Sequence, residues 1–204
     1  MNREQSTHHE RVYVDLEYQH PGFDHGEKPC PADYREIVQI SAIIWDMVRS
    51  EEKMAFDRLV RQVRWPRLHP RFIALTGITE ERLQAEAVIF EQVYEDFIEF
   101  VGDREIWCFG YDHGVFLQNL AWHDYSAVDI REPFCDVRRM LKAGGVDIEQ
   151  YSSGTLWRLV PRLDMSDGQV HNALHDVRSM AAAVDHLAKE FLEKPLGSMT
   201  DMFW

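Results

Sequence analysis

The sequence predicts an α/β fold in which helices flank a mixed five-stranded sheet. Three strand-like segments follow one another near the N-terminus with no helical pattern between them, as in an antiparallel meander. Two shorter strand-like segments then alternate with helical ones, an order that favours parallel neighbours with helices on the faces of the sheet. With 204 residues and 45% hydrophobic composition, the chain can build one substantial core. We expect a single domain over residues 1–204, with its core at about 11–194.

Three strands are predicted before any helix. The first is residues 11–17, RVYVDLE, a β-branched and aromatic run that ends in acids. The second is residues 36–46, EIVQISAIIWD, and the third is residues 54–65, MAFDRLVRQVRW. Between the first two lies YQHPGFDHGEKPCPADY, whose prolines and glycines predict a loop. Loops of this length are often functional.

The remaining elements alternate between helix and strand. HPRFIALTGIT predicts short helical pieces broken by Gly77, and VIFEQVYEDFIEFVG predicts an amphipathic helix that ends at Gly102. EIWCFG is predicted to be a buried strand, and YDHGVFLQNLAWHD a helix that begins just after Gly110. EPFCDVRRMLKAGG fits a short strand that runs into a helix, and SSGTLWRLVPRL a further helical segment. The last helix is expected over residues 172–194.

A net charge of −13 argues against a protein that coats nucleic acid through bulk charge. It leaves room for a nuclease, whose clustered carboxylates are partly neutralised by metal ions. A local basic patch would hold the substrate of such an enzyme. One segment, residues 53–72, could form this patch, and Asp57 is its only acidic residue. Its basic residues are Lys53, Arg58, Arg61, Arg64, Arg67 and Arg71. The alternative is a solvated strand and loop.

The sequence also bears on location and redox chemistry. No apolar run approaches the roughly 18 residues of a membrane span, and the N-terminus lacks the hydrophobic core of a signal peptide. We therefore expect a soluble, cytoplasmic protein with no membrane partner. Cys30, Cys108 and Cys135 form no C-x-x-C pair, so neither a disulfide framework nor a cysteine zinc site is indicated.

Four carboxylates stand at places where the predicted elements meet. Asp15 and Glu17 are two apart on the first strand, so both side chains point to the same side of the sheet. Asp112 follows the buried strand EIWCFG, and Asp176 lies about one turn inside the last helix. If the first and fourth strands are neighbours and the last helix packs across them, all four converge. Oxygen ligands in that number suit Mg²⁺ or Mn²⁺ rather than zinc.

The stretch HNALHD, which contains Asp176, offers a different metal site. His171 and His175 are four apart and would share one face of a helix, as zinc ligands do. In a metalloprotease helix, however, a general-base Glu follows the first His, and here that residue is Asn172. Asn172 is better explained as the N-cap of the last helix, which leaves His171 in the preceding loop.

Taken together, these motifs resemble the DEDDh 3′-to-5′ exonucleases, the relatives of RNase T, oligoribonuclease and the proofreading subunit of bacterial DNA polymerase III. The resemblance rests on VDLE, LTGIT, an Asp after a strand in mid-chain, and H-x-x-x-x-D before a closing helix, and it runs from about Arg11 to Lys194. It implies a ribonuclease H-like fold whose first three strands are antiparallel.

The resemblance also implies roles for the site residues. Two divalent cations, Mg²⁺ or Mn²⁺, would be held by the four acids: Asp15 would contact both, Glu17 and Asp176 would complete one site, and Asp112 would bind directly or through water. His171 would be the general base, a task suited to histidine. His175 would be a bystander.

Substrate contacts follow from the same resemblance, since LTGIT lies beside the terminal nucleotide in the family. Gly77 allows a tight turn, and apolar side chains can pack on a base face without reading its edge. The aromatic residues of the loop after Glu17 could also stack on bases. The residues expected to bind substrate are Leu75, Thr76, Ile78, Tyr18, His20 and, in the same loop, Phe23.

The surroundings of the third acid differ from N-x-x-F-D, which many members carry. WCFGYDHGVFL is closer to the W-G-x-x-D pattern of the Eri-type RNA exonucleases, although only Tyr111 separates Gly110 from Asp112. Asp124 is therefore the alternative third acid. The pattern favours RNA over DNA.

The sequence thus predicts a metal-dependent exonuclease that releases nucleoside monophosphates from single-stranded 3′ ends. Three alternatives remain at this stage: a DNA-directed enzyme of the same family, a catalytically idle module that binds RNA or protein, and a zinc hydrolase built on the two histidines. Members of the family differ in oligomeric state, so a homodimer stays open.

Overall fold

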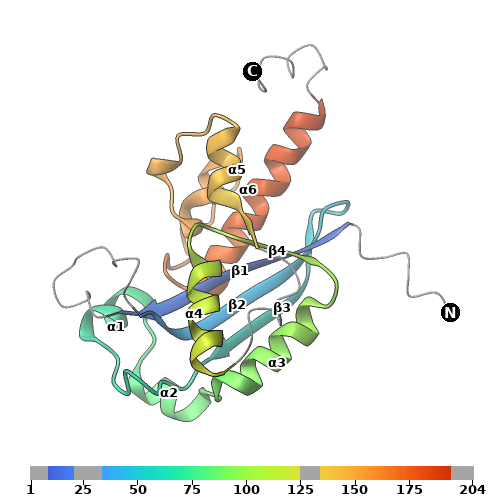
Figure 1. The fold of residues 1–204 in the computed structure, drawn as a ribbon. Coiled ribbons are helices and arrows are strands. Elements are labelled where there is room, and N and C mark those ends of the chain that lie inside the picture. The colour runs from blue at the N-terminus through green and yellow to red at the C-terminus, as the bar shows by residue number, and fades with distance from the viewer. Residues whose placement is uncertain (1–8, 21–33, 125–133, 194–204) are drawn as a thin grey trace.

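A five-stranded mixed sheet runs through the centre of the protein (Figure 1). The structure is a computed structural model that describes residues 9–20, 34–124 and 134–193. The predicted loop residue Phe23 and the C-terminal tail lie outside these residues. The strands are β1 (Glu10–Gln19), β2 (Glu36–Asp46), β3 (Glu51–Leu59), β4 (Glu105–Cys108) and β5 (Cys135–Asp136).

The strand order is β3-β2-β1-β4-β5. The pairs β1–β2 and β2–β3 are antiparallel, whereas β1–β4 and β4–β5 are parallel. The predicted fold class, a mixed five-stranded sheet whose first three strands are antiparallel, is therefore confirmed. Because β1 is the central strand and β4 lies beside it, the ends of both strands meet at one edge, as the convergence of the four acids required.

The third strand was placed wrongly along the sequence: it covers 51–59 instead of 54–65. At its start, the Asp46 carboxylate accepts the backbone N–H groups of Val48 and Arg49, which closes a tight turn and brings Glu51 into register with Asp46. Beyond its end, the Glu36 carboxylate accepts backbone N–H groups of residues 63–65, so these groups do not pair with a neighbouring strand. Hydrophobic pattern alone detects neither side-chain hydrogen bond.

Most helices occur where the sequence predicts them. The helices are α1 (Pro70–Thr76), α2 (Glu80–Glu86), α3 (Phe90–Val101), α4 (Asp112–Trp122), α5 (Val137–Ala143) and α6 (Ala173–Glu193), together with the 3₁₀ helices η3 (Ile148–Gln150) and η4 (Ser153–Leu159). Of these, α2 and η3 lie outside the predicted helical segments. Gly77, with φ of 72°, separates α1 from α2. None of the helices in the described ranges is long and apolar enough to cross a membrane.

Two helical layers cover the sheet, and the alternation of β1 shows which side chain meets which layer. Val12, Val14 and Leu16 pack with α3 and α4 on one face. Tyr13 points to the other face, where it joins a core built from α5, α6 and the 3₁₀ helices. Asp15 and Glu17 continue this second row, so both acids face the layer that contains α6.

Candidate active site

The first two acids lie at the end of the central strand, almost fully covered. Asp15 is 6% exposed and Glu17 is 7% exposed. A register shift in the pairing of β1 with β2 falls between Glu17 and Tyr18. Such a bulge redirects the strand just after the acids and marks the rim of the site.

Asp112 reaches the same place from the neighbouring strand. It is the first residue of α4, and it follows a turn at Gly110, where φ is +81° and a side chain would be strained. The Gly110 N–H donates to Asp136 Oδ1 at 3.1 Å, which ties this turn to the end of β5. Asp124, the alternative third acid, lies exposed beyond the other end of α4. An 11-residue helix is about 16 Å long, so Asp124 does not reach the cluster.

The start of α6 supplies the last acid and the histidine. Asn172 Oδ1 accepts the His175 N–H at 3.2 Å, which confirms the predicted N-cap. Asp176 is therefore in the first turn of α6, where it is 1% exposed. His171 precedes the cap with φ of +68°, an uncommon conformation for a residue with a side chain and one that often marks functional sites.

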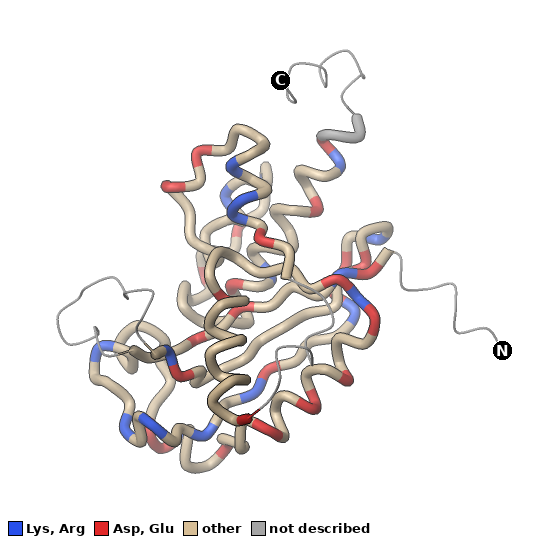
Figure 2. The backbone as a smooth tube through the Cα atoms, in the orientation of Figure 1, with Lys and Arg blue, Asp and Glu red and all other residues tan. Residues whose placement is uncertain are grey.

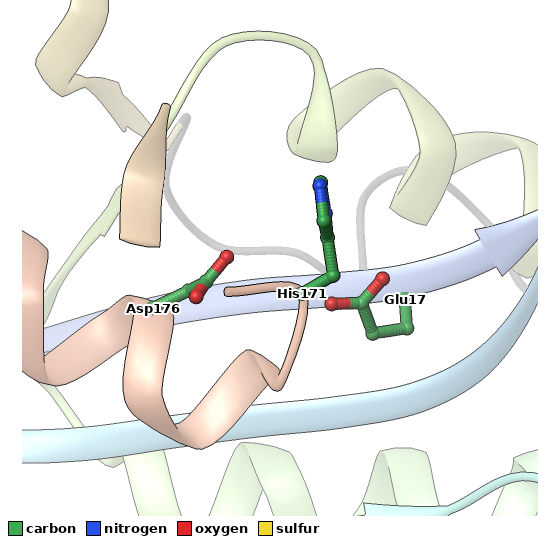
Figure 3. A group of neighbouring side chains, drawn as sticks. All are labelled: Glu17, His171 and Asp176. Carbon is green, nitrogen blue, oxygen red and sulfur yellow. The ribbon is translucent and has the colours of Figure 1, made fainter. Parts of the chain in front are cut away.

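One pocket brings the predicted residues together. Besides the four acids and His171, its lining includes Leu16, Tyr18, His20, Phe72, Leu75, Phe109 and Ser153. Within it, a ring nitrogen of His171 and carboxylate oxygens of Glu17 and Asp176 lie within 4.8 Å of one another. Figure 3 shows the two carboxyl groups turned toward each other with His171 between them.

Two residues of the LTGIT stretch are not on the pocket wall. Leu75 lines the pocket and is 39% exposed, whereas Ile78 is 1% exposed and Thr76 is also buried. The Thr76 hydroxyl donates to Phe72 O and accepts the Ile78 N–H. These bonds hold the turn after α1, and neither Thr76 nor Ile78 is among the residues that line the pocket.

His175 does not share the position of His171. Its Nε2 lies 3.2 Å from the carbonyl oxygen of Gly154, and its ring fills the space that a side chain at Gly168 would need. A zinc site that joins His171 and His175 is therefore not formed.

Sequence reasoning missed two neighbours of Asp176 on η4. The Ser153 hydroxyl donates to Asp176 Oδ2 at 3.0 Å. A Cβ at Gly154 would lie 2.2 Å from Asp176 Oδ1, so only glycine leaves room for the carboxylate. The sequence SSG resembles an ordinary helix start, and nothing in it indicates a contact with an acid that follows more than 20 residues later.

The electrostatics of the pocket favour a bound cation. Burial raises the pKa of all four acids. Repulsion from Asp112, Asp176 and Glu17 raises the pKa of Asp15 further. Repulsion from Asp136 and Asp176 raises the pKa of Asp112 further. Burial together with the charges of Asp176 and Asp112 raises the pKa of Glu17 to about 9.

The donor set also fits metal ions. Asp112 Oδ2 and Asp176 Oδ1 are buried and accept no hydrogen bond from any described residue. No Lys or Arg is among the described residues that line the pocket. Buried carboxylate oxygens without partners are costly unless they are neutralised, and such oxygens are the ligands that hard divalent cations prefer.

Comparisons with known proteins agree with this geometry. The family model described as RNase T, exonuclease, matches residues 15–184. In sequence, no curated protein matches the chain. Among solved structures, the nuclease domain of 3′hExo, a DEDDh family member bound to rAMP, has 17% identity and a TM-score of 0.76, with 93% of this chain and 96% of that chain covered.

Two further structures have the same fold. The cell-death related nuclease 4 (CRN-4) has 16% identity and a TM-score of 0.65, with 89% of this chain and 64% of that chain covered. E. coli exonuclease I in complex with a dT13 oligonucleotide has 15% identity and a TM-score of 0.63, with 89% of this chain and 42% of that chain covered.

Proposed function

The chain belongs to the RNase T exonuclease family, and from this premise we propose that it is a metal-dependent 3′-to-5′ exonuclease. It releases nucleoside monophosphates from single-stranded nucleic acid ends, with RNA favoured over DNA. The observation that carries the proposal is the pocket in which four buried carboxylates and His171 converge. Among the described residues, no Lys or Arg lines this pocket. Apolar and aromatic side chains form the rest of its wall.

Asp15, Glu17, Asp112 and Asp176 are the residues that would hold two divalent cations, Mg²⁺ or Mn²⁺. When bound, such a pair stabilises charge on the attacking and leaving oxygens of a phosphoryl displacement. The protein contributes rigid placement: Asp15 comes from the central strand, and Ser153 fixes one oxygen of Asp176 through a hydrogen bond.

His171 is the proposed general base, which removes a proton from the attacking water. It lies on the pocket wall within reach of the Glu17 and Asp176 carboxylates. The Asn172 cap and the left-handed backbone of His171 hold its ring at the rim instead of within α6. Histidine is the side chain that most often carries out such proton transfer near neutral pH.

The apolar part of the pocket is the proposed site for the terminal nucleotide. Leu75 and Tyr18 offer surfaces on which a base can stack without being read by its edge. The backbone of this region is anchored from the His171 loop, since Gln169 Nε2 donates to the Leu75 carbonyl at 3.2 Å. Thr76 and Ile78 then act through the shape of the turn.

The preference for RNA has two supports. One is the likeness of WCFGYD to the Eri-type pattern. The other is that similar nuclease domains were solved with rAMP and for recognition of a histone mRNA stem-loop. A DNA-directed exonuclease is the second candidate, because E. coli exonuclease I with dT13 shares the fold.

The test is a time course with 5′-labelled single-stranded RNA and DNA of one sequence, with Mg²⁺, with Mn²⁺ and with chelator. We expect a metal-dependent ladder that shortens from the 3′ end, faster on RNA. Asp15→Asn, Asp112→Asn and His171→Ala should abolish release while the fold survives, whereas the matched control Asp124→Asn should retain it. Equal rates for Asp15→Asn and wild type would overturn the mechanism. Metal-independent binding without turnover would indicate an idle binding module.

A further inference from the structure

Five arginines follow one another from the end of β3 to the first turn of α1. All of their side chains are exposed, and among the described residues none of them pairs with a carboxylate. They are Arg58, Arg61, Arg64, Arg67 and Arg71. Elsewhere in the described chain arginines commonly have such a partner, as Arg104 has Glu10 and Arg178 has Glu52. We refer to the five as the arginine strip.

An acid that contacts this segment, Glu36, is already occupied by backbone groups. Glu36 is buried, and its carboxylate accepts the N–H groups of Val63, Arg64 and Trp65 at 2.7, 2.9 and 2.7 Å. The loop is thereby fixed by its backbone, and none of the five arginines is used to hold it through an ion pair with Glu36. A chain of net charge −13 thus carries a local reversal of sign. Figure 2 shows Lys and Arg gathered at the lower left, around α1 and α2, and acidic residues along α3.

The strip is attached directly to the candidate active site. Gln19 is two residues beyond Glu17, and its Nε2 donates to the carbonyl oxygens of Trp65 at 3.1 Å and Arg67 at 3.5 Å. Its Oε1 accepts the His69 N–H at 3.1 Å. The segment then enters α1, which supplies Phe72 and Leu75 to the pocket wall. A nucleic acid strand that leaves the pocket past α1 would therefore meet the arginine strip.

One arginine is also held flat by stacking. The Arg64 guanidinium carbon lies 2.8 Å from the ring centroid of Trp122 and 4.6 Å from that of Tyr34. These two rings are themselves stacked, with centroids 3.5 Å apart. A stacked guanidinium keeps its N–H edge free, and this planar fork matches a phosphate group.

From these observations we propose that the arginine strip binds the phosphodiester backbone of the substrate strand upstream of its 3′ end. The inference rests on the proposed function, because the pocket defines where the 3′ end lies. An acidic peptide would satisfy the same charges, but only a polynucleotide continues from the pocket with one phosphate for every nucleotide.

The test compares a triple variant, Arg61→Gln, Arg64→Gln and Arg67→Gln, with a control of equal charge change, Arg49→Gln, Arg138→Gln and Lys142→Gln. Binding of a labelled RNA strand of about 20 nucleotides is followed by fluorescence anisotropy in chelator between 50 and 200 mM salt. Three lost phosphate contacts lower the salt slope by about 2, so wild-type affinity should fall about sixteen-fold more than that of the variant over this range. The control should match wild type.

Hydrolysis supplies the second measurement. The variant should lose kcat/KM on the long strand and retain it on a dinucleotide, which is too short to reach the strip. Equal losses on both substrates, or a salt slope unchanged from wild type, would overturn the proposal. Failure of the proposed function is distinguishable, since wild type would then hydrolyse neither substrate while anisotropy would still report on the strip.

Discussion

Glu17→Gln should stabilise the metal-free protein at neutral pH while it removes activity. Burial and the charges of Asp176 and Asp112 raise the pKa of Glu17 from 4.5 to about 9. The folded state therefore holds a proton that the unfolded chain releases, and stability falls as pH rises between these two values. The glutamine amide has the same shape and does not ionise, so the variant escapes this penalty.

The magnitude follows from the size of the shift. At pH 7 the unfolded Glu17 is about 2.5 pH units above its pKa, and at 1.36 kcal/mol per unit the penalty is about 3 kcal/mol. At pH 5 it falls below about 1 kcal/mol. Urea unfolding in chelator at both pH values measures the difference. Glu99→Gln, the same substitution at an exposed position on α3, is the control and should match wild type.

Divalent cation should narrow the difference in stability between Glu17→Gln and wild type. A cation at a hundred times its Kd adds about 2.7 kcal/mol to wild type, and a site that lacks one carboxylate should gain less. If Glu17→Gln is no more stable than wild type in chelator at pH 7, burial and the neighbouring charges do not raise the pKa of Glu17 as the geometry indicates. The case for a cation site would then lose its electrostatic basis.

Three substitutions around Asp176 have separate expected outcomes. Gly154→Ala should displace the Asp176 carboxylate and destabilise the fold by about 1–3 kcal/mol, because its Cβ would lie 2.2 Å from Oδ1; thermal unfolding with and without Mg²⁺ would show both effects. Ser153→Ala removes the hydrogen bond to Oδ2 and should raise the Mg²⁺ concentration for half-maximal activity by about tenfold or more; it should also destabilise the protein in chelator by about 1–3 kcal/mol, because a buried carboxylate oxygen loses its donor, and an unchanged Mg²⁺ requirement would contradict it. Asn172→Ala removes the cap of α6 and should cost about 1 kcal/mol, and full retention of kcat would mean that the cap does not position His171.

The fold could be predicted because its elements carry strong local patterns. β2 was placed residue for residue, since an apolar run of β-branched residues is bounded by Asp46 and its turn. The amphipathic helix that ends at Gly102 was recovered for the same reason. β3 was misplaced because Glu36 binds the loop beyond it, a contact between segments far apart in the chain.

The same distinction separates the predicted part of the site from the missed part. Strand periodicity was enough to predict that Asp15 and Glu17 lie on the same face of the sheet. The N-cap of the last helix was enough to predict that His171 precedes this helix and that Asp176 lies near its start. Ser153 could not be found in this way, because its role exists only when η4 lies against α6. That Thr76 and Ile78, predicted to bind substrate, do not line the pocket has a related cause. A motif shows that a turn is needed, but burial decides which of its side chains faces the pocket.

The choice between magnesium and zinc also depends on tertiary contacts. His171 lies beside Glu17 and Asp176, and these three groups alone could form a small site with a nitrogen ligand. A zinc centre would use the His171 nitrogen as a ligand and would need no further acids. Here Asp15 and Asp112 are buried in the same pocket, and Asp112 leaves one oxygen without a described partner. Four acids exceed what one zinc ion requires but suit two oxygen-preferring cations, in line with the proposed mechanism, in which His171 accepts a proton.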